Sequence, residues 1–127
     1  MKVFLTGASG VMGRSSIEAL HQAGHNVVGL ARTPKSAAQI EALGAQSCLG
    51  DIYDVDALSA GMRGCEVVAN LATKVPVGGA ALMPGSLRAV DRIRMRGSKV
   101  VADAAQRADV GRIIQQSLSF IYADHDD

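Results

Sequence analysis

The chain has 127 residues, of which 48% are hydrophobic and 20% are charged, and its formal net charge is +1. The length suits one domain, and the composition excludes a disordered chain because enough apolar residues are present to bury a core. The balanced charge gives no support to a strongly cationic protein that binds nucleic acid or a membrane surface. The amino-terminal apolar run is too short for a signal peptide and no stretch approaches a membrane span, so we expect a cytoplasmic protein.

Short apolar runs alternate with longer stretches of helical periodicity along the chain. Strands are expected over residues 3–6, 27–31, 46–49, 65–71 and 112–117. Helices are expected over residues 11–23, 34–43, 55–62 and 86–108. Thr33, followed by Pro34, and Asp54 are the expected N-caps of the second and third helices. The Gly- and Pro-rich residues 73–85 predict a loop that is long enough to be functional.

This alternation predicts an α/β fold of right-handed βαβ units around a parallel sheet. We expect a single Rossmann-type, doubly wound domain over residues 1–127, with strand order 3-2-1-4-5. Ligands of such sheets bind in the crevice at the carboxyl ends of the first and fourth strands, where the winding reverses. The last helix is expected to bury one face of apolar and small residues, namely Leu87, Val90, Ile93, Gly97, Val100, Ala104 and Ala108.

Three glycines at regular spacing, Gly7, Gly10 and Gly13, lie between the first expected strand and the first helix. The first permits a tight turn, the second lets the backbone approach a diphosphate, and the third lets the helix pack closely on the sheet. The helix then directs unpaired N–H groups at the phosphates. An ordinary glycine-rich turn is the alternative, but this placement favours a dinucleotide site. The expected contacts are Gly7, Ser9, Gly10, Val11, Met12 and Gly13.

The end of the second expected strand bears on the choice between NAD and NADP. Proteins that prefer NAD commonly place a carboxylate there to bond the ribose 2′-hydroxyl, but this position is Ala31, and Arg32 follows it. A guanidinium can form charge-assisted hydrogen bonds with a 2′-phosphate, and Arg14 and Lys35 add positive charge nearby. We therefore expect NADP as the cofactor, with NAD possible, and a simply solvated Arg32 is the alternative.

Two further strand ends are candidate parts of the site. Asp51 could accept a hydrogen bond from the adenine amino group, with Ile52 against the ring, or it could instead cap a turn. Leu71, Ala72 and Thr73 follow the fourth strand and could line the ribose and nicotinamide part of the cofactor. Tight packing is the alternative role of these small and apolar residues.

Together these features resemble the extended short-chain dehydrogenase/reductase superfamily, of the nucleoside-diphosphate-sugar epimerase and dehydratase type. The matching segments are residues 6–13, 50–51, 64–72 and 111–117, the last leading to Tyr122, and they span essentially the whole chain. The resemblance implies the fold, a nicotinamide cofactor and a cytoplasmic setting, but it implies no particular substrate.

The sequence departs from that superfamily at the residues of catalysis. Members carry a Tyr-x-x-x-Lys pair after the fifth strand, whereas Tyr122 has no lysine partner and the chain ends at Asp127. Leu118 stands at the family's serine position and Asp91 at its asparagine position. The carboxy-terminal substrate lobe is also absent, so we expect this chain alone to bind cofactor without turnover. A noncatalytic dinucleotide-sensing module is the alternative, since such a module needs no catalytic pair.

Neither the cysteines nor the histidines predict a metal or redox site. Cys48 and Cys65 lie in apolar stretches and are expected to be reduced core residues. His21 and His25 flank Gly24, which is expected to end the helix between them, so a zinc pair is not predicted.

The last helix and the last strand bear on possible partners. Five cations on the helix lack interleaved aromatic residues and predict a solvated face rather than a nucleic-acid surface. They are Arg88, Arg92, Arg94, Arg96 and Lys99. The last strand would form a sheet edge with apolar Ile113 and Ile114, and such an edge favours pairing with a second copy of the chain as a homodimer.

Overall fold

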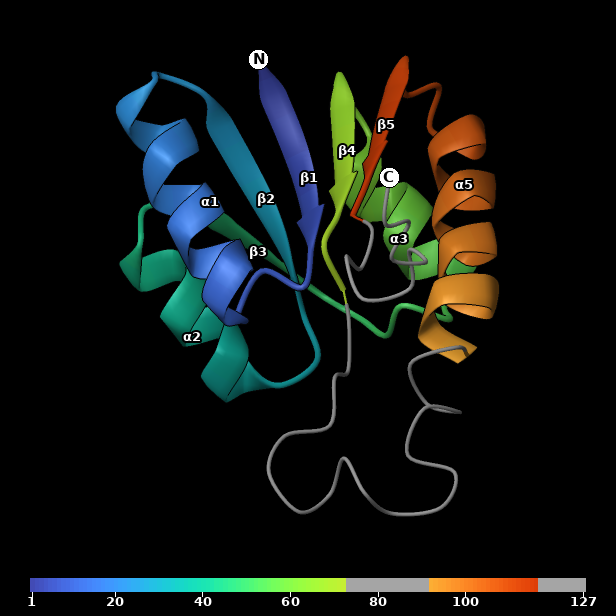
Figure 1. Cartoon of the computed structure of the whole chain (residues 1–127), viewed down its shortest axis with the longest axis horizontal. Coiled ribbons are helices and arrows are strands. Elements are labelled where there is room, and N and C mark those ends of the chain that lie inside the picture. The colour runs from blue at the N-terminus through green and yellow to red at the C-terminus, as the bar shows by residue number, and fades with distance from the viewer. Residues whose placement is uncertain (73–91, 117–127) are drawn as a thin grey trace, which may run out of the picture.

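The computed structural model of the protein describes residues 1–72 and 92–116. The strands are β1 (Lys2–Thr6), β2 (Asn26–Ala31), β3 (Gln46–Leu49), β4 (Val67–Asn70) and β5 (Arg112–Gln115). The helices are α1 (Val11–Gln22), α2 (Pro34–Ala42), α3 (Val55–Met62) and α5 (Ser98–Arg107), and a π-helical segment, η2 (Ile93–Gly97), leads into α5. All five strands form one parallel sheet in the order β3-β2-β1-β4-β5, which confirms the predicted topology (Figure 1).

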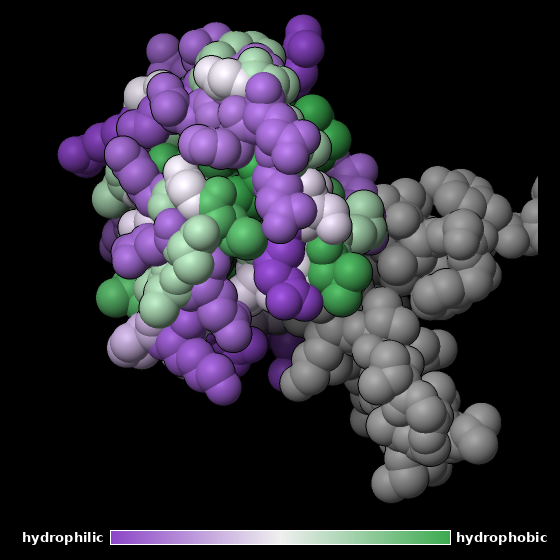
Figure 2. All heavy atoms as spheres, turned by 90° about the vertical axis from the view of Figure 1, so that its left-hand side faces the viewer, coloured by the Kyte–Doolittle hydropathy of each residue, from purple (hydrophilic) through white to green (hydrophobic). Residues whose placement is uncertain are grey.

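Two helical layers enclose the sheet, with α1 and α2 on one face and α3 and α5 on the other (Figure 1). The side chains of β1 alternate accordingly. Val3 and Leu5 join the core under α1 and α2, whereas Phe4 joins the core under α3 and α5. The outer side of α1 and α2 presents mainly hydrophilic side chains with apolar ones between them (Figure 2). Among the described helices, none is long and apolar enough to cross a membrane.

The predicted signals at the starts of α2 and α3 act as expected. Thr33 Oγ1 accepts a hydrogen bond from the Ser36 backbone N–H at 3.1 Å, and Pro34 is the first residue of α2. Asp54 Oδ1 accepts one from the Ala57 backbone N–H at 3.1 Å, at the start of α3. Side chains therefore satisfy backbone donors at the amino termini of both helices.

The last helix differs from its expected form in one respect. Its residues 93–97 are π-helical, and a π turn contains more residues than an α turn, so the buried face that follows is displaced along the sequence. Val101 and Ala105 are buried, while the expected Val100 and Ala108 are only half-buried. Val101, Ala104 and Ala105 form the part of the described helix that joins the core.

Part of the predicted architecture lies outside the described residues. This applies to the loop over residues 73–85, to the first turns of the long helix and to the segment after residue 116. The residues discussed above that lie there are Thr73, Leu87, Arg88, Val90, Asp91, Leu118, Tyr122 and Asp127.

β5 ends the sheet within the described part of the chain. Its apolar side chains are accessible, since Ile113 is 41% exposed and Ile114 is 53% exposed. These exposures are compatible with pairing of two copies through β5, which remains a prediction.

Candidate functional site

The loop from β1 to α1 passes beside the end of β4, where the winding of the sheet reverses. Gly7 has a φ of +66°, a left-handed conformation that residues with a side chain rarely adopt. A Cβ atom at this position would lie 2.7 Å from the backbone carbonyl carbon of Leu71, just after β4. The fold itself therefore requires glycine at position 7.

Gly13 is required for a different reason, the close packing of α1 on the loop. It is buried in the first turn of the helix. A Cβ atom there would overlap the Gly7 carbonyl oxygen and would lie 2.6 Å from Ala8 Cα. Backbone atoms cannot rotate away as a flexible side chain can, so any larger residue would force α1 from its position.

Gly10 has no comparable role in the fold. Its φ of −75° and ψ of 176° are open to any residue, and the residue is exposed. Within the described chain, a Cβ atom there would have one neighbour closer than 4 Å, the Gly7 carbonyl oxygen at 3.3 Å. The absence of a side chain also leaves the space outside the loop open.

The amino terminus of α1 presents backbone donors without a side-chain cap. Gly10 is the N-cap residue, and no acidic residue lies in the first turn. The first backbone bond of the helix runs from the Arg14 N–H to the Gly10 carbonyl at 2.9 Å, so the N–H groups of residues 11–13 have no helical partner. α2 and α3, in contrast, have side-chain caps. Uncapped donors at the positive end of a helix dipole bind anions.

Two cavities open at the carboxyl ends of the strands and meet at the loop. The loop cavity has a volume of about 400 Å³ and is lined by Gly7, Ser9, Gly10, Val11, Met12, Gly13, Leu71 and Gln116. The β2 cavity has a volume of about 270 Å³ and is lined by Gly7, Ser9, Leu30, Arg32, Thr33, Ser36 and Ile52. Because Gly7 and Ser9 belong to both, the cavities form one groove from the end of β2, over the loop, to the ends of β4 and β5.

The groove brings together all of the predicted site residues except Asp51, Ala72 and Thr73, the last of which lies outside the described residues. Asp51 Oδ1 accepts a hydrogen bond from the Tyr53 backbone N–H at 2.9 Å, so the side chain caps a turn. That turn places the buried Ile52 in the β2 cavity. The structure thus contains the turn cap considered for Asp51, and its hydrogen bond with an adenine amino group stays a prediction.

The two cations expected near the ribose are not among the residues that line the groove. Arg14 and Lys35 are exposed on the first turns of α1 and α2, and neither lines a cavity described above. Arg32 is the cation that does so, beside the hydroxyls of Thr33 and Ser36. Any discrimination by charge within the β2 cavity therefore falls to Arg32.

A buried polar network below the loop was not predicted from the sequence. Thr6 and Asn70 are buried at the ends of β1 and β4, and Thr6 Oγ1 donates to Asn70 Oδ1. Thr6 Oγ1 also accepts the Ala72 backbone N–H at 3.2 Å, and Asn70 Nδ2 donates to Gln115 Oε1 at 2.8 Å. The network joins the ends of β1, β4 and β5 and so fixes the walls of the loop cavity. A polar residue that closes an apolar strand is the sequence signal that could have identified it.

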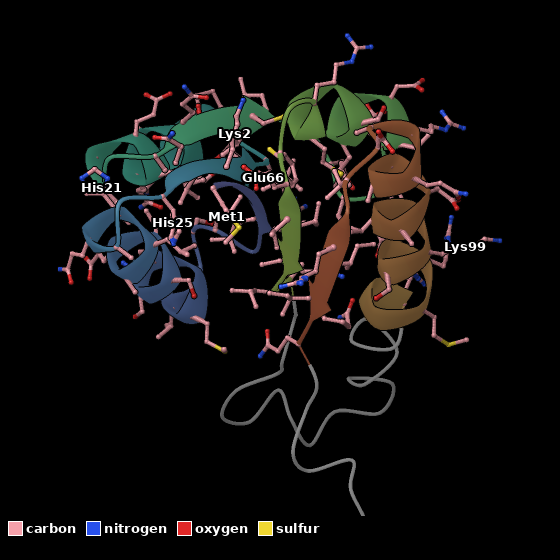
Figure 3. All side chains as sticks on the ribbon, turned by 90° about the horizontal axis from the view of Figure 1, so that it is seen from above. Met1, Lys2, His21, His25, Glu66 and Lys99 are labelled. Atoms are coloured by element: carbon pink, nitrogen blue, oxygen red, sulfur yellow. The ribbon has the colours of Figure 1, made fainter. Side chains whose placement is uncertain are left out.

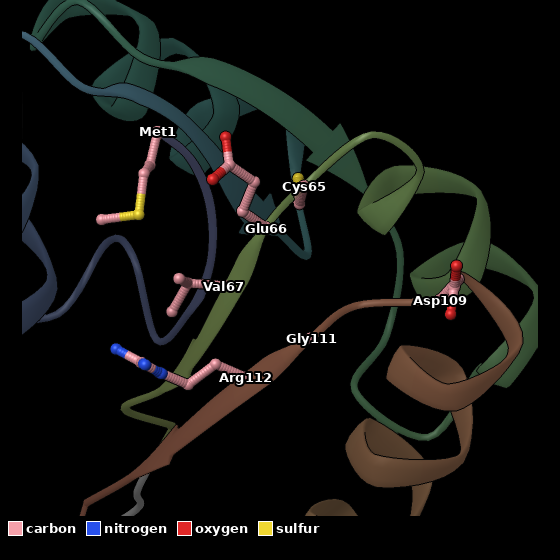
Figure 4. A pocket seen from close by; sticks show the side chains of 7 residues that line it. All are labelled: Met1, Cys65, Glu66, Val67, Asp109, Gly111 and Arg112. Carbon is pink, nitrogen blue, oxygen red and sulfur yellow. The ribbon is translucent and has the colours of Figure 1, made fainter.

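A third cavity lies at the opposite edge of the sheet, at the amino ends of the strands (Figure 4). This amino-end cavity has a volume of about 450 Å³ and is lined by Met1, Cys65, Glu66, Val67, Asp109, Gly111 and Arg112. Seen from this edge, Met1 and His25 lie side by side, with 2.9 Å between the terminal amine and the imidazole Nδ1 (Figure 3). Ligands of doubly wound sheets bind at the carboxyl ends of the strands, so we expect the site in the groove, although this cavity is larger than the loop cavity or the β2 cavity taken alone.

Neither thiol has the environment of a reactive cysteine. Both are free, and burial raises the pKa of Cys48 and of Cys65, although Lys2 partly opposes the shift at Cys65. A raised pKa disfavours the thiolate, which is the reactive form. Within residues 1–72 and 92–116, no group of three or more His, Cys, Asp or Glu residues could hold a metal ion.

Comparison with known proteins points in the same direction as the geometry. A family model described as NAD(P)H-binding matches residues 7–127. The 4-hydroxy-2-methyl-3-oxo-4-farnesyl-3,4-dihydroquinoline-1-oxide ketoreductase of Stigmatella aurantiaca is 34% identical over 128 residues, which cover 98% of this chain and 35% of that protein. The 2-alkyl-3-oxoalkanoate reductase of Shewanella oneidensis is 36% identical over 76 residues, which cover 60% of this chain and 19% of that protein.

Solved structures share the same fold. A UDP-glucose-4-epimerase from Stenotrophomonas maltophila, with bound NAD and formylated UDP-arabinopyranose, superposes with a TM-score of 0.82 at 25% identity, over 100% of this chain and 40% of that one. An NADPH-dependent quinone oxidoreductase from Escherichia coli superposes with a TM-score of 0.67 at 24% identity, over 91% of this chain and 34% of that one. The chain spans about a third or less of the length of the curated relatives that it matches first.

Proposed function

The chain belongs to the NAD(P)H-binding family, within the short-chain dehydrogenase/reductase superfamily, and from this premise we propose that it binds NADP(H) in the groove formed by the loop cavity and the β2 cavity. It would act there as the cofactor-binding part of an NAD(P)-dependent oxidoreductase or epimerase. The observation that carries the proposal is Gly10, a glycine whose backbone conformation is open to any residue, at the uncapped amino terminus of α1.

The loop suits the diphosphate of a dinucleotide. Its two negative charges would lie at the positive end of α1, where the N–H groups of residues 11–13 can donate to phosphate oxygens. Gly10 admits the phosphates close to the backbone. Ser9 is half-buried and lines both cavities, so its hydroxyl is available on the path between the two halves of the dinucleotide.

The β2 cavity suits an adenosine that carries a 2′-phosphate. The buried Ile52 offers apolar surface to the adenine ring. Arg32 brings a guanidinium to the same cavity, beside Thr33 and Ser36, whose hydroxyls bond each other and the backbone at the start of α2. Among the described residues that line it, none is a carboxylate, the group that would bond a free 2′-hydroxyl and repel a phosphate. These features support NADP over NAD.

The loop cavity would receive the nicotinamide half of the cofactor. Val11 and Met12 are apolar side chains that are 78% and 51% exposed beside the loop, and a bound dinucleotide would cover part of that surface. When bound, a nicotinamide cofactor supplies hydride transfer, and the described residues of this chain bind and orient it. Since the relatives named above include reductases and an epimerase, we propose that the whole protein transfers hydride to or from an oxygen-bearing carbon of its substrate.

Titration of NADPH and NADH against the protein and against Arg32→Asp tests this proposal. The fluorescence of the reduced nicotinamide can report the binding of both nucleotides. Loss of a charge-assisted bond to the 2′-phosphate should weaken NADPH about tenfold to a hundredfold. The affinity for NADH should change less than about twofold, since NADH lacks that phosphate. Arg63→Asp, at the exposed carboxyl end of α3, is the matched charge-reversal control and should affect neither nucleotide.

The possible outcomes separate the parts of the proposal. An equal loss for both nucleotides would remove Arg32 from the phosphate site and with it the argument for NADP. If the unaltered chain bound neither nucleotide, the proposed function itself would be overturned.

A further inference from the structure

Gln116, the first residue after β5, lines the loop cavity with a carboxamide that is poorly paired. Its Nε2 donates to Met12 Sδ at 3.1 Å, and a thioether sulfur is a weak acceptor. Its Oε1 is buried and has no hydrogen-bond partner within the described part of the chain. Buried polar atoms are nearly always paired, so this oxygen indicates that a donor belongs in the cavity.

The backbone of Gln116, in contrast, is well held. Its N–H donates to the Asn70 carbonyl at 3.2 Å, and its own carbonyl accepts Gln115 Nε2 at 3.1 Å. The Gln115 carboxamide is occupied by this bond and by the polar network through Asn70. Gln116 therefore has a fixed position at the end of β5, while the last torsion of its side chain can turn at little cost.

The composition of the loop cavity makes Gln116 distinctive. Among the described residues that line it, Ser9 and Gln116 are those with polar side chains. Ser9 also lines the β2 cavity, so it lies toward the adenosine half of the groove. At the β5 end, the side-chain hydrogen bonds available to a ligand from the described residues come from Gln116.

We propose that the Gln116 carboxamide binds the nicotinamide riboside half of the dinucleotide, with Oε1 accepting a hydrogen bond from a hydroxyl of that ribose. This inference rests on the proposed function, because it takes the diphosphate to lie on the glycine loop. A dinucleotide that runs from the β2 cavity across the loop brings its second ribose toward β4 and β5. The ribose hydroxyl gives Oε1 the donor that it lacks, and this bond does not compete with the weak one from Nε2 to Met12 Sδ.

The test compares two ligands on three proteins by calorimetry. NADPH carries the nicotinamide riboside, whereas adenosine 2′,5′-bisphosphate carries the adenosine and 2′-phosphate without it. Gln116→Met keeps the length of the side chain and removes both polar atoms. Loss of one neutral hydrogen bond should weaken NADPH about threefold to tenfold and leave the bisphosphate within about twofold of the unaltered protein. Gln106→Met, on the exposed surface of α5, is the matched control and should change neither affinity.

Each outcome decides one question. Retained binding of the bisphosphate shows that Gln116→Met is folded, so a selective loss of NADPH supports the inference. Unchanged NADPH affinity would overturn it, and so would an equal loss of both ligands, which would assign Gln116 a role in the whole site. If the unaltered protein bound neither ligand, the proposed function would fail instead, independently of Gln116.

Discussion

The carboxyl ends and the amino ends of the strands, here called the carboxyl edge and the amino edge of the sheet, offer different backbone groups to a ligand. The sizes of the cavities do not reveal this difference. The amino-end cavity, at about 450 Å³, is larger than the loop cavity at about 400 Å³ or the β2 cavity at about 270 Å³. In a sheet built of βαβ units, however, the helices run against the strands, so helix amino termini gather at the carboxyl edge and helix carboxyl termini at the amino edge (Figure 1). A ligand therefore meets backbone N–H groups at the first edge and backbone carbonyls at the second.

The starts of the helices sharpen this contrast. Thr33 and Asp54 cap α2 and α3, and α1 begins at Gly10 without a side-chain cap. At the amino edge, Glu66, Asp109 and Arg112 bring charges of both signs, all on side chains. An anion thus finds fixed, preorganised donors at the start of α1. We therefore base the proposed site on the free end of a helix rather than on the volume of a cavity.

The largest expected effect comes from Gly13→Ala, which would disrupt the packing of α1 at the carboxyl ends of the strands. The added Cβ atom overlaps backbone atoms of the loop, so α1 must move away from the sheet. We expect a loss of at least about 3 kcal/mol in the free energy of unfolding, at the upper end of the cost of overpacking. Chemical denaturation followed by circular dichroism measures it. A variant of unchanged stability would contradict the packing role of Gly13.

Gly10→Val should weaken nucleotide binding with little change in the stability of the fold. The conformation of Gly10 is open to valine, and a Cβ atom there has one close neighbour, at 3.3 Å, within the described chain. We expect stability within about 1 kcal/mol of the unaltered protein, the scale of an unfavourable N-cap residue. Binding of NADPH and NADH should fall at least about a hundredfold, because the side chain occupies the path of the diphosphate.

Thermal unfolding and the fluorescence titration on the same sample measure the two effects of Gly10→Val. Gly10→Ala serves as the graded control, with a smaller loss of binding from a smaller side chain. Retained affinity in the valine variant would mean that the diphosphate does not lie against this part of the loop.

The features that could be predicted are those whose signals lie close together in the sequence. The strand over residues 46–49, the N-cap at Thr33 and the glycine spacing each depend on a few consecutive residues, and the structure confirms the strand and the cap. The order of the strands followed because right-handed βαβ connections leave few alternatives. Local signals combined with general rules of chain winding were therefore sufficient for the fold.

The features that could not be predicted depend on contacts between distant residues. Thr6 and Asn70 are 64 positions apart, and their hydrogen bond exists because β1 and β4 are neighbours in register. Gln116 enters the loop cavity because β5 ends beside the start of α1, more than a hundred residues earlier in the chain. Asp51 bonds its own turn because the chain places the Tyr53 N–H beside Oδ1. These contacts depend on the direction in which side chains point across the sheet, and the sequence pattern does not specify that direction.

The smallest expected effect comes from a variant in the amino-end cavity, at the opposite ends of the strands. Arg112→Glu reverses a charge in the amino-end cavity, as Arg32→Asp does in the β2 cavity. The four residues of β4 that separate the edges extend about 13 Å at about 3.3 Å per residue. That separation exceeds the Debye length of about 8 Å at physiological ionic strength, so the reversed charge is largely screened from the groove. We expect the NADPH affinity of Arg112→Glu to stay within about twofold in the fluorescence titration. A loss comparable to that of Arg32→Asp would place the phosphates at the amino edge, because only a ligand in direct contact with Arg112 could respond so strongly.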